Sequence, residues 1–540
     1  MRELFRSITK KEWRLVLALA AVIVIVTAVP YLYGYFSAPA GKVYTGIHYL
    51  TPGDTNVMLS NIEQVKQGHD IFINPYTAEP QHRIYVNPFW LGVGWMAKIF
   101  QMSALLAYHV ARSLLIFVFL FVVYLFLAYI FADSKRRVWA ILVICTASGL
   151  GLFFNPFLFD VNRIYEHPTD TWVPESVSFL TLYHSPHLIA SVTLIVLVFL
   201  LMLIAFDRNQ YRYSISAGIA GLFLLWFHPF NGPTIFGVLM TYMLLVFLRD
   251  RKLYWGYVRH YCILAAFAIP PTVYMYYLSR TDWVIRKWNE QNLLPSPTVW
   301  MYLIGYGILV PLALYGLWIT LKDTKNKGIF LISWLITSSA LLYVPIYFQR
   351  RLSEGLHIPI AILATAGIIA LYERWREPSP SSWQIKASVL VISLVIFLPL
   401  SNFQIMGQDI FNYQTEKTYP YYVDRTEIEA MYWLKDNTTL DDVVFSTYEI
   451  GNFIPAYSGR IVWLGHGPQT INLEEKFRTA QWFWREDGED GEKYDLLKAD
   501  RVTYVWYGEH EKLLGAYNPA TKPYLKKIFS NADVTVYRVE

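Results

Sequence analysis

The chain has 540 residues, of which 55% are hydrophobic and 16% are charged. Hydrophobic runs of about 18 to 25 residues recur along its first three quarters, and a helix of that length crosses the roughly 30 Å hydrocarbon core of a bilayer. A soluble globular fold is therefore excluded. The net charge of +5 comes from basic residues spread over short loops, so it does not indicate a nucleic-acid partner.

The hydrophobic runs predict about eleven transmembrane helices. The first run follows a cluster of basic residues and is longer than the hydrophobic part of a cleavable signal peptide, so we expect it to remain as an anchor. The expected spans lie near residues 13–36, 105–131, 138–156, 188–206, 214–228, 232–248, 261–278, 299–321, 328–346, 358–373 and 387–404.

Basic residues gather in every second short loop, which predicts that these loops are cytoplasmic. We therefore expect a multi-pass protein of the cell membrane with its N-terminus inside and its C-terminus outside. Cys145 and Cys262 fall within expected spans, so no disulfide is expected. The basic residues of the inner loops are Lys135, Arg136, Arg137, Arg208, Arg212, Arg249, Arg251, Lys252, Arg259, Lys322, Lys325, Lys327, Arg374, Arg376 and Lys386.

The long polar segments all fall on the outer side. A first outer loop covers residues 37–104 and a second covers 157–187, both within a transmembrane domain of residues 1–404. A linker of residues 405–419 leads to an extracytoplasmic domain of residues 420–540, where strand-like and helix-like stretches alternate. The expected fold is an all-α membrane bundle with a small extracytoplasmic α/β domain at its C-terminal end.

Two segments of the first outer loop have helical character. Residues 54–68 place Val57, Ile62 and Val65 at helical spacing among polar residues, which predicts an amphipathic helix along the membrane surface. Residues 87–100 are hydrophobic but too short to span, which favours a re-entrant or interfacial helix.

Asp54 opens the amphipathic helix directly after a Pro52-Gly53 turn. An aspartate before a helix is a favoured N-cap, because its carboxylate accepts a hydrogen bond from a backbone N–H two or three residues on. No glutamate or glutamine stands three positions later to complete a capping box. The residues alone leave open whether Asp54 is a cap or a catalytic carboxylate, and Glu63 and Glu79 are its competitors in the loop.

Arg350 and Arg351 break the charge pattern by standing on the outer side. They precede the expected span 358–373, where the free N–H groups of a helix start favour an anion, and a guanidinium has the fork of donors that matches a phosphate. The competing interpretation is that Glu354 neutralises one of them and the other reaches lipid headgroups. Arg112 within the second span needs a partner or a wet cavity, and it joins them as a candidate for phosphate binding.

Further candidates for substrate binding stand near the outer ends of the expected spans. His184 and His187 have a spacing that suits two ligands of a metal or a phosphate, with Glu175 as a natural third. Ser185 and Pro186 between them also make an ordinary helix start, and that alternative stays open. The auxiliary candidates are Glu175, His184, His187, His228, Glu354 and His357.

Five segments together resemble the GT-C superfamily of polytopic glycosyltransferases, which take a sugar from a polyprenyl-phosphate carrier on the outer side of the membrane. The resemblance covers most of the chain and rests also on the order of the loops and the one-sided polar mass. The segments are GDTNVMLSNIEQVKQG, NPFWLGVGWMAKIF, SFLTLYHSPHLIAS, FQRRLSEGLHIPIAILA and EIGNFIPAYSGRIVWLGHGPQT.

The resemblance implies that Asp54 is a general base, which takes the proton of an acceptor hydroxyl as this attacks C1 of the sugar and inverts it. It implies that Arg350 and Arg351 stabilise the departing lipid phosphate. Many members carry paired carboxylates in the first outer loop, whereas Thr55 and Asn56 follow Asp54 here. The participation of a divalent metal therefore stays open.

The implied activity is an inverting transfer of a sugar, hexosyl or pentosyl, from a polyprenyl-phosphate donor to a hydroxyl of a lipid, glycan or protein. His466 in the tail segment LGHGPQT is implied to face the substrate cavity, although a strand-to-helix turn explains it as well. The alternative is a non-catalytic transporter or lipid-handling protein whose outer domain binds a partner. Transporters tend to show repeated halves, and the sequence shows none.

Overall fold

The computed structural model describes residues 1–50, 52–158, 161–323, 326–376, 380–486 and 489–540. The chain folds as two compact units, each built from three separate segments. Unit 1 comprises Met1–Val29, Ala111–Tyr274 and Leu294–Gln408. Unit 2 comprises Pro30–Val110, Met275–Leu293 and Asp409–Glu540.

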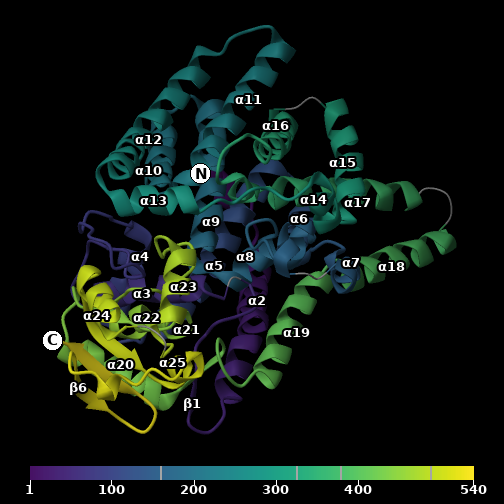
Figure 1. The fold of residues 1–540 in the computed structure, drawn as a ribbon. Coiled ribbons are helices and arrows are strands. Elements are labelled where there is room, and N and C mark those ends of the chain that lie inside the picture. The colour runs from purple at the N-terminus through teal and green to yellow at the C-terminus, as the bar shows by residue number, and fades with distance from the viewer. Residues whose placement is uncertain (51, 159–160, 324–325, 377–379, 487–488) are drawn as a thin grey trace. The chain divides into compact units, whose positions relative to one another are not determined.

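Helices account for most of the described chain (Figure 1). The α-helices are α1 (Arg2–Arg6), α2 (Lys10–Phe36), α3 (Asp54–Lys66), α4 (Pro88–Ile99), α5 (Ala104–Ile130), α6 (Ser134–Thr146), α7 (Gly151–Leu158), α8 (Ser178–His184), α9 (Pro186–Arg208), α10 (Tyr211–Phe227), α11 (Gly232–Asp250), α12 (Trp255–Thr281), α13 (Trp283–Gln291), α14 (Val299–Tyr306), α15 (Leu309–Asp323), α16 (Asn326–Leu341), α17 (His357–Arg376), α18 (Pro380–Phe397), α19 (Leu400–Thr415), α20 (Arg425–Asn437), α21 (Tyr448–Gly451), α22 (Ile454–Ser458), α23 (Leu473–Phe483), α24 (Asp490–Ala499) and α25 (Glu509–Leu514). The 3-10 helices are η1 (Val161–Glu166), η2 (Thr169–Thr171), η3 (Pro229–Asn231), η4 (Gln349–Ser353) and η5 (Pro519–Thr521).

Seven helical segments of the described chain are long and apolar enough to cross a membrane. An eighth is added if α14 and α15, which are bent by 87° at their junction, form one broken span. The protein is therefore a multi-pass membrane protein. The seven segments are Lys10–Phe36, Ala104–Ile130, Ser134–Phe154, Pro186–Arg208, Pro229–Asp250, Trp255–Thr281 and Gln349–Trp375.

The predicted count of about eleven spans is not confirmed. Two of the expected spans form helices shorter than the roughly 20 residues of a full crossing. The helix α10 has 17 residues and α16 has 16. Residues 387–404 are divided between α18 and α19, and α19 also covers residues 405–415, where a linker was expected. The number of crossings and the domain boundaries remain predictions.

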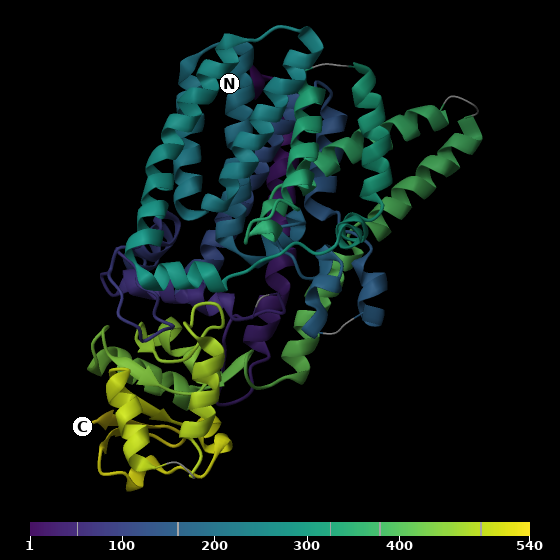
Figure 2. The same ribbon diagram turned by 45° about the horizontal axis from the view of Figure 1, so that its top comes forward.

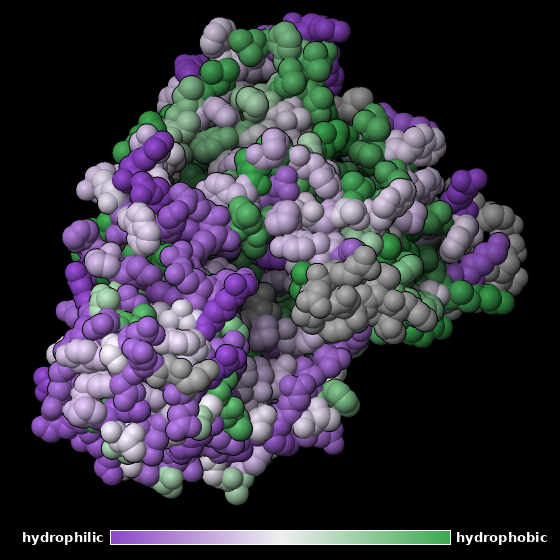
Figure 3. All heavy atoms as spheres, viewed as in Figure 1, coloured by the Kyte–Doolittle hydropathy of each residue, from purple (hydrophilic) through white to green (hydrophobic). Residues whose placement is uncertain are grey.

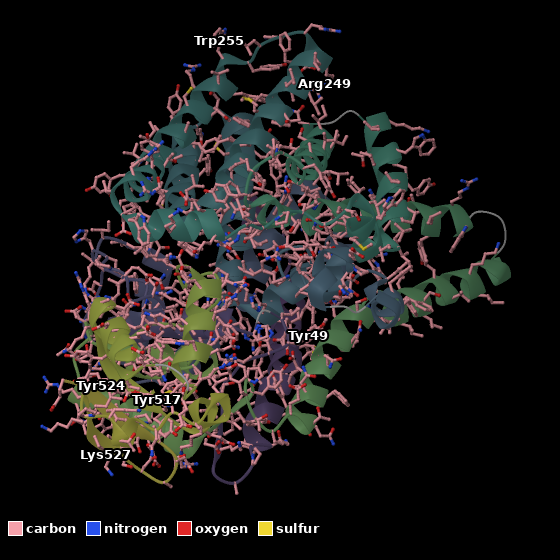
Figure 4. All side chains as sticks on the ribbon, viewed as in Figure 1. Tyr49, Arg249, Trp255, Tyr517, Tyr524 and Lys527 are labelled. Carbon is pink, nitrogen blue, oxygen red and sulfur yellow. The ribbon has the colours of Figure 1, made fainter. Side chains whose placement is uncertain are left out.

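Local sequence signals set several helix ends in unit 1. The helix α9 begins with Pro186 directly after Ser185, as its sequence predicts, and ends before Asn209, whose φ of 50° is left-handed. Figure 2 shows the long helices of unit 1 lying side by side. Arg249 and Trp255 flank the basic connection from α11 to α12 (Figure 4). Apolar side chains are exposed along these helices, as expected of surfaces that face lipid (Figure 3).

The C-terminal part of unit 2 holds a mixed five-stranded sheet with the strand order β4-β3-β5-β7-β6. The strand β3 runs parallel to both β4 and β5, whereas β7 is antiparallel to β5 and β6. The predicted α/β character of the tail is confirmed. The strands are β3 (Val443–Phe445), β4 (Ile461–Val462), β5 (Val502–Tyr507), β6 (Leu525–Ser530) and β7 (Thr535–Val539).

Helices cover both faces of this sheet. Successive residues of a strand point to opposite faces, so each central strand contributes side chains to two hydrophobic cores. On β3, Val444 packs in a core with residues of α20 and α22, whereas Phe445 packs in a second core with residues of α23 and α24. On β5, Trp506 and Val505 divide in the same way. The result is three layers, helix, sheet and helix.

The first outer loop belongs to the same unit as the tail. Its strand β1 (Lys42–Tyr44) pairs antiparallel with β2 (Tyr422–Asp424) at the start of the tail. Its helix α3 packs against α4 and α22. Polar residues of α3 are buried together with apolar ones, and Glu63 pairs with Lys66 and Lys435. Protein therefore covers most of this helix, and its position along the membrane surface stays a prediction.

Candidate functional site

Asp54 is the first residue of α3, and Gly53 occupies the N-cap position. The first turn is closed by the N–H of Asn56, which donates to the carbonyl oxygen of Gly53 at 3.1 Å. The interpretation of Asp54 as the N-cap of this helix is therefore wrong by one residue. A carboxylate within the first turn is still favoured by the helix dipole.

His466 is the partner of the Asp54 carboxylate within unit 2. Its Nε2 lies 3.1 Å from Asp54 Oδ1. The His466 side chain is only 7% exposed and its ring packs against Tyr76, whereas the Asp54 side chain is 46% exposed. A buried imidazole thus fixes a carboxylate that remains accessible on its other side. The hydrogen-bond geometry assigns the proton to Nε2 when Asp54 is ionised.

The turn that carries His466 is fixed from both sides by other segments of unit 2. In the first outer loop, Asn74 donates to the carbonyl oxygen of Gln469 at 2.7 Å, and Tyr76 accepts from Thr470 Oγ1 at 2.9 Å. Beside α13, Gln291 accepts from the N–H of Asn472 at 3.1 Å. The imidazole is therefore positioned by a rigid support.

Several buried polar atoms near Asp54 have no hydrogen-bond partner in the described part of the chain. They are Thr55 Oγ1, both polar atoms of the Asn56 amide, Asn452 Oδ1 and His466 Nδ1. A Cβ placed on Gly53 would lie 2.8 Å from the His466 ring and 3.8 Å from Asn452 Oδ1, so these groups share one neighbourhood. Buried polar groups are nearly always hydrogen-bonded, so such a concentration marks a place for a ligand or water.

In unit 1, Arg350 and Arg351 lie on η4, just before α17. The guanidinium of Arg350 stacks over the Trp172 ring at 4.9 Å, and that of Arg351 stacks over the Phe230 ring at 4.5 Å. An aromatic face holds a guanidinium without neutralising it. Each of the two cations is therefore oriented by an aromatic ring.

Glu354 pairs with a histidine within unit 1. Its carboxylate is fully buried, lies 3.0 Å from His228 Nδ1 and accepts from Asn231 Nδ2 at 2.9 Å. Ser191 joins the network through both His228 and Asn231. His228 and Asn231 are the partners found for the Glu354 carboxylate among the described residues, and its neutralisation of an arginine stays an open alternative.

The second outer loop lies against η4 and α17 in unit 1. Glu175 is buried in this loop. His357 contacts the hydroxyl of Ser178 through Nδ1 at 2.9 Å. The loop also contributes the Trp172 ring beneath Arg350.

The two predicted histidines before α9 have different surroundings. The Nδ1 atom of His187 contacts the hydroxyl of Ser185, and its ring lies edge-on to His228 with 5.7 Å between centroids. His184 is buried as the last residue of α8. Within the described ranges no three His, Cys, Asp or Glu side chains form a group that could hold a metal ion, the set with Glu175 included. A role for a divalent metal stays a prediction.

Arg112 on α5 is almost completely buried in unit 1. Its Nη1 donates to Thr27 Oγ1 at 2.9 Å and to the carbonyl oxygen of Leu182 at 3.3 Å. That carbonyl lies in the last turn of α8, where a cation satisfies acceptors that the helix leaves open.

The sequence did not point to the aromatic partners of the arginines or to Asn452. Trp172 and Phe230 are far from η4 along the chain, and nothing in an aromatic residue marks it as a cation partner. Asn452 falls within the resembling segment EIGNFIPAY, which was the one available signal.

No protein-family model matches this sequence, and no curated protein matches it either. Solved structures are similar in fold. The oligosaccharyltransferase of Archaeoglobus fulgidus in its apo form is 14% identical, with a TM-score of 0.57 over 92% of this chain and 70% of that chain. ArnT from Cupriavidus metallidurans bound to undecaprenyl phosphate is 10% identical, with a TM-score of 0.53 over 98% of both chains.

The arabinofuranosyltransferase AftD from Mycobacteria is 13% identical, with a TM-score of 0.52 over 97% of this chain and 41% of that chain. Other structures of the archaeal enzyme contain an acceptor peptide, an inhibitory peptide with dolichol-phosphate, or zinc and sulfate. All three proteins are glycosyltransferases of the GT-C superfamily. At these identities the likeness concerns the fold, and the chain therefore has the GT-C fold.

Proposed function

We propose that the protein is a glycosyltransferase that moves a sugar from a polyprenyl-phosphate donor to a hydroxyl acceptor on the extracytoplasmic side of the membrane. The GT-C fold supports this assignment, as do the polyprenyl phosphates bound by the archaeal oligosaccharyltransferase and by ArnT. The observation that carries it is the Asp54–His466 contact, because it fixes an accessible carboxylate at a helix start.

In the proposed reaction Asp54 is the general base. The acceptor oxygen forms a bond to C1 of the sugar, its proton passes to the Asp54 carboxylate, and the bond from C1 to the phosphate oxygen breaks. The electron pair of that bond leaves with the polyprenyl phosphate. Attack from the face opposite the phosphate inverts the configuration at C1. His466 keeps the carboxylate oriented by donating from Nε2.

Arg350 and Arg351 are proposed to stabilise the negative charge on the leaving phosphate. Their guanidiniums are oriented by the rings of Trp172 and Phe230, which lysine would use less well because it lacks a planar fork. Arg112 receives a supporting role, since its guanidinium holds the end of α8. The other auxiliary candidates, namely Glu175, His184, His187, His228, Glu354 and His357, are proposed to shape the surroundings of the two arginines.

The test is transfer by the purified full-length protein in lipid nanodiscs. A panel of polyprenyl-phosphate sugars is offered with hydroxyl acceptors, and release of polyprenyl phosphate is measured. For the wild type we expect release with at least one donor, and for Asp54→Asn a loss of about 100-fold or more in kcat, since general base catalysis contributes roughly 10²- to 10⁴-fold. Donor binding should persist, because the amide keeps the size of the carboxylate.

Asp70→Asn is the matched control, because Asp70 is an exposed aspartate of the same outer loop. It should leave the rate unchanged. Full activity of Asp54→Asn would overturn the base assignment. Binding of every donor by the wild type without any release would instead favour a lipid-handling protein.

A further inference from the structure

A groove of about 530 Å³ lies on the surface of unit 2 between α21 and α23. Ligand sites of proteins commonly have volumes of about 300 to 1,000 Å³ and combine apolar walls with a few placed polar groups. The groove fits this description. Its lining residues are Tyr448, Leu473, Glu474, Phe477, Arg478 and Gln481.

The walls of the groove are aromatic. Tyr448 and Phe477 stand edge to face with 6.2 Å between their ring centroids, and Phe477 is 39% exposed. Part of the Phe477 ring is therefore open to a ligand. A flat apolar face of this kind suits the C–H surface of a sugar ring.

The rim of the groove is polar and electrically balanced. Glu474 and Arg478 lie one turn apart on α23 and pair at 2.7 Å, with Gln481 one turn further on. Carboxylate, guanidinium and amide are planar groups whose two adjacent atoms can bind two neighbouring hydroxyls at once. Because the two charges offset each other, the rim favours a neutral ligand.

One end of the groove reaches the neighbourhood of Asp54. A Cβ at Gly467 would lie 3.7 Å from the Tyr448 hydroxyl and 3.9 Å from Leu473, and Gly467 directly follows His466. Asn452 donates to the carbonyl oxygen of Tyr448 at 2.9 Å and keeps its buried Oδ1 without a partner among the described residues. Burial raises the pKa of Tyr448, and the charges of Glu449 and Asp54 make smaller contributions in the same direction.

We propose that this groove binds the acceptor and that the acceptor is a neutral glycan, whose reactive hydroxyl is directed toward Asp54. The inference rests on the proposed function and names its acceptor class. A peptide that binds by adding a strand is a poorer occupant, because the groove is lined by side chains of helices and offers no open strand edge. An acyl chain is poorer still, because one side of the groove is charged.

The first experiment measures binding and needs no catalysis. Full-length protein in nanodiscs is mixed with neutral methyl glycosides of hexoses and pentoses and with their disaccharides, and saturation-transfer NMR detects contact. We expect transfer to ring C–H protons of at least one glycoside, with an affinity about 5- to 10-fold weaker for Phe477→Ala. Tyr432→Ala is the control, because Tyr432 is a similarly exposed aromatic residue on the different helix α20, and it should bind as the wild type does.

Three outcomes overturn the groove proposal: no glycoside binds the wild type, Phe477→Ala binds as well as the wild type, or acceptor-type peptides bind there in place of glycosides. A second experiment separates it from the proposed function. With an active donor and acceptor, Phe477→Ala should raise the acceptor KM about 5- to 10-fold and leave kcat and the donor KM unchanged. An unchanged acceptor KM together with an inactive Asp54→Asn would sink the groove and leave the transferase standing.

Discussion

At the scale of single residues, the carboxylate of Asp54 depends on a partner that the sequence could not identify. His466 is 412 residues away along the chain, and its contact with Asp54 arises because the first outer loop and the tail belong to one folded unit. The sequence marked both residues as candidates through the family resemblance. It could not supply their distance, because a contact between remote segments is set by tertiary packing and leaves no local pattern.

We predict that His466→Ala lowers kcat by about 10- to 100-fold, because a hydrogen bond to a charged group is worth roughly 1.5–3 kcal/mol and each 1.4 kcal/mol is a factor of ten in rate. His466→Gln should recover much of the loss, since its amide can still donate to Asp54. Initial rates at saturating donor and acceptor give the comparison. Similar melting temperatures for both variants would show that the fold is intact, and equal kcat values for wild type and His466→Ala would remove the imidazole from the mechanism.

At the scale of elements, the tail was predictable and the first outer loop was less so. The tail was expected to alternate strand-like and helix-like stretches, and the structure has the helix α20 and the strands β3, β4, β5 and β7 there. The strand β6 is harder to predict, because LKKIFS carries two lysines on an edge of the sheet. Burial of α3 was missed, since its polar residues find partners only in the folded unit.

The helix α20 carries a buried acid that makes the stability of unit 2 depend on pH. Burial raises the pKa of Glu427 to about 7, with smaller contributions from the charges of Asp424, Glu511 and Glu509. The unfolded chain releases this proton near the ordinary value of 4.5, whereas the folded chain keeps it until about pH 7. Stability from this group is therefore present below pH 4.5 and is lost as pH rises to 7.

We predict that Glu427→Gln has little effect at pH 4.5 and stabilises the protein at pH 8 by about 1–3 kcal/mol, since the amide carries no charge to bury. The amide oxygen can still accept from the N–H of Asp424, as the carboxylate does at 3.3 Å. Melting temperatures of both proteins from pH 4.5 to 8 provide the measurement. Glu429→Gln, an exposed neighbour on the same helix, should show no such trend. Parallel curves for Glu427→Gln and wild type would contradict the buried charge.

At the scale of the whole molecule, the sequence predicts the membrane class and the sidedness of the loops, but not the number of crossings. The length of a hydrophobic run identifies a helix that can cross the membrane. For shorter helices such as α10 and α16, whether they cross depends on their packing against other helices, which the length of the run does not reveal. The predicted orientation rests on the Lys and Arg residues of alternate loops. It therefore depends on the number of crossings, because one missed crossing would reverse the side assigned to every later loop.

Cysteine labelling in intact cells tests that orientation directly. Ser530 is exposed on β6, an edge strand that also carries Lys527 (Figure 4), whereas Ser458 in the same unit is buried and unsuitable. In a Cys262→Ser background, which leaves only the buried Cys145, Ser530→Cys should react with a membrane-impermeant maleimide added outside. Ser134→Cys, at the exposed first residue of α6 on the expected cytoplasmic side, should react only after permeabilisation. The reverse pattern would place the tail, and with it Asp54 and His466 of the same unit, on the cytoplasmic side, where an extracytoplasmic transfer could not take place.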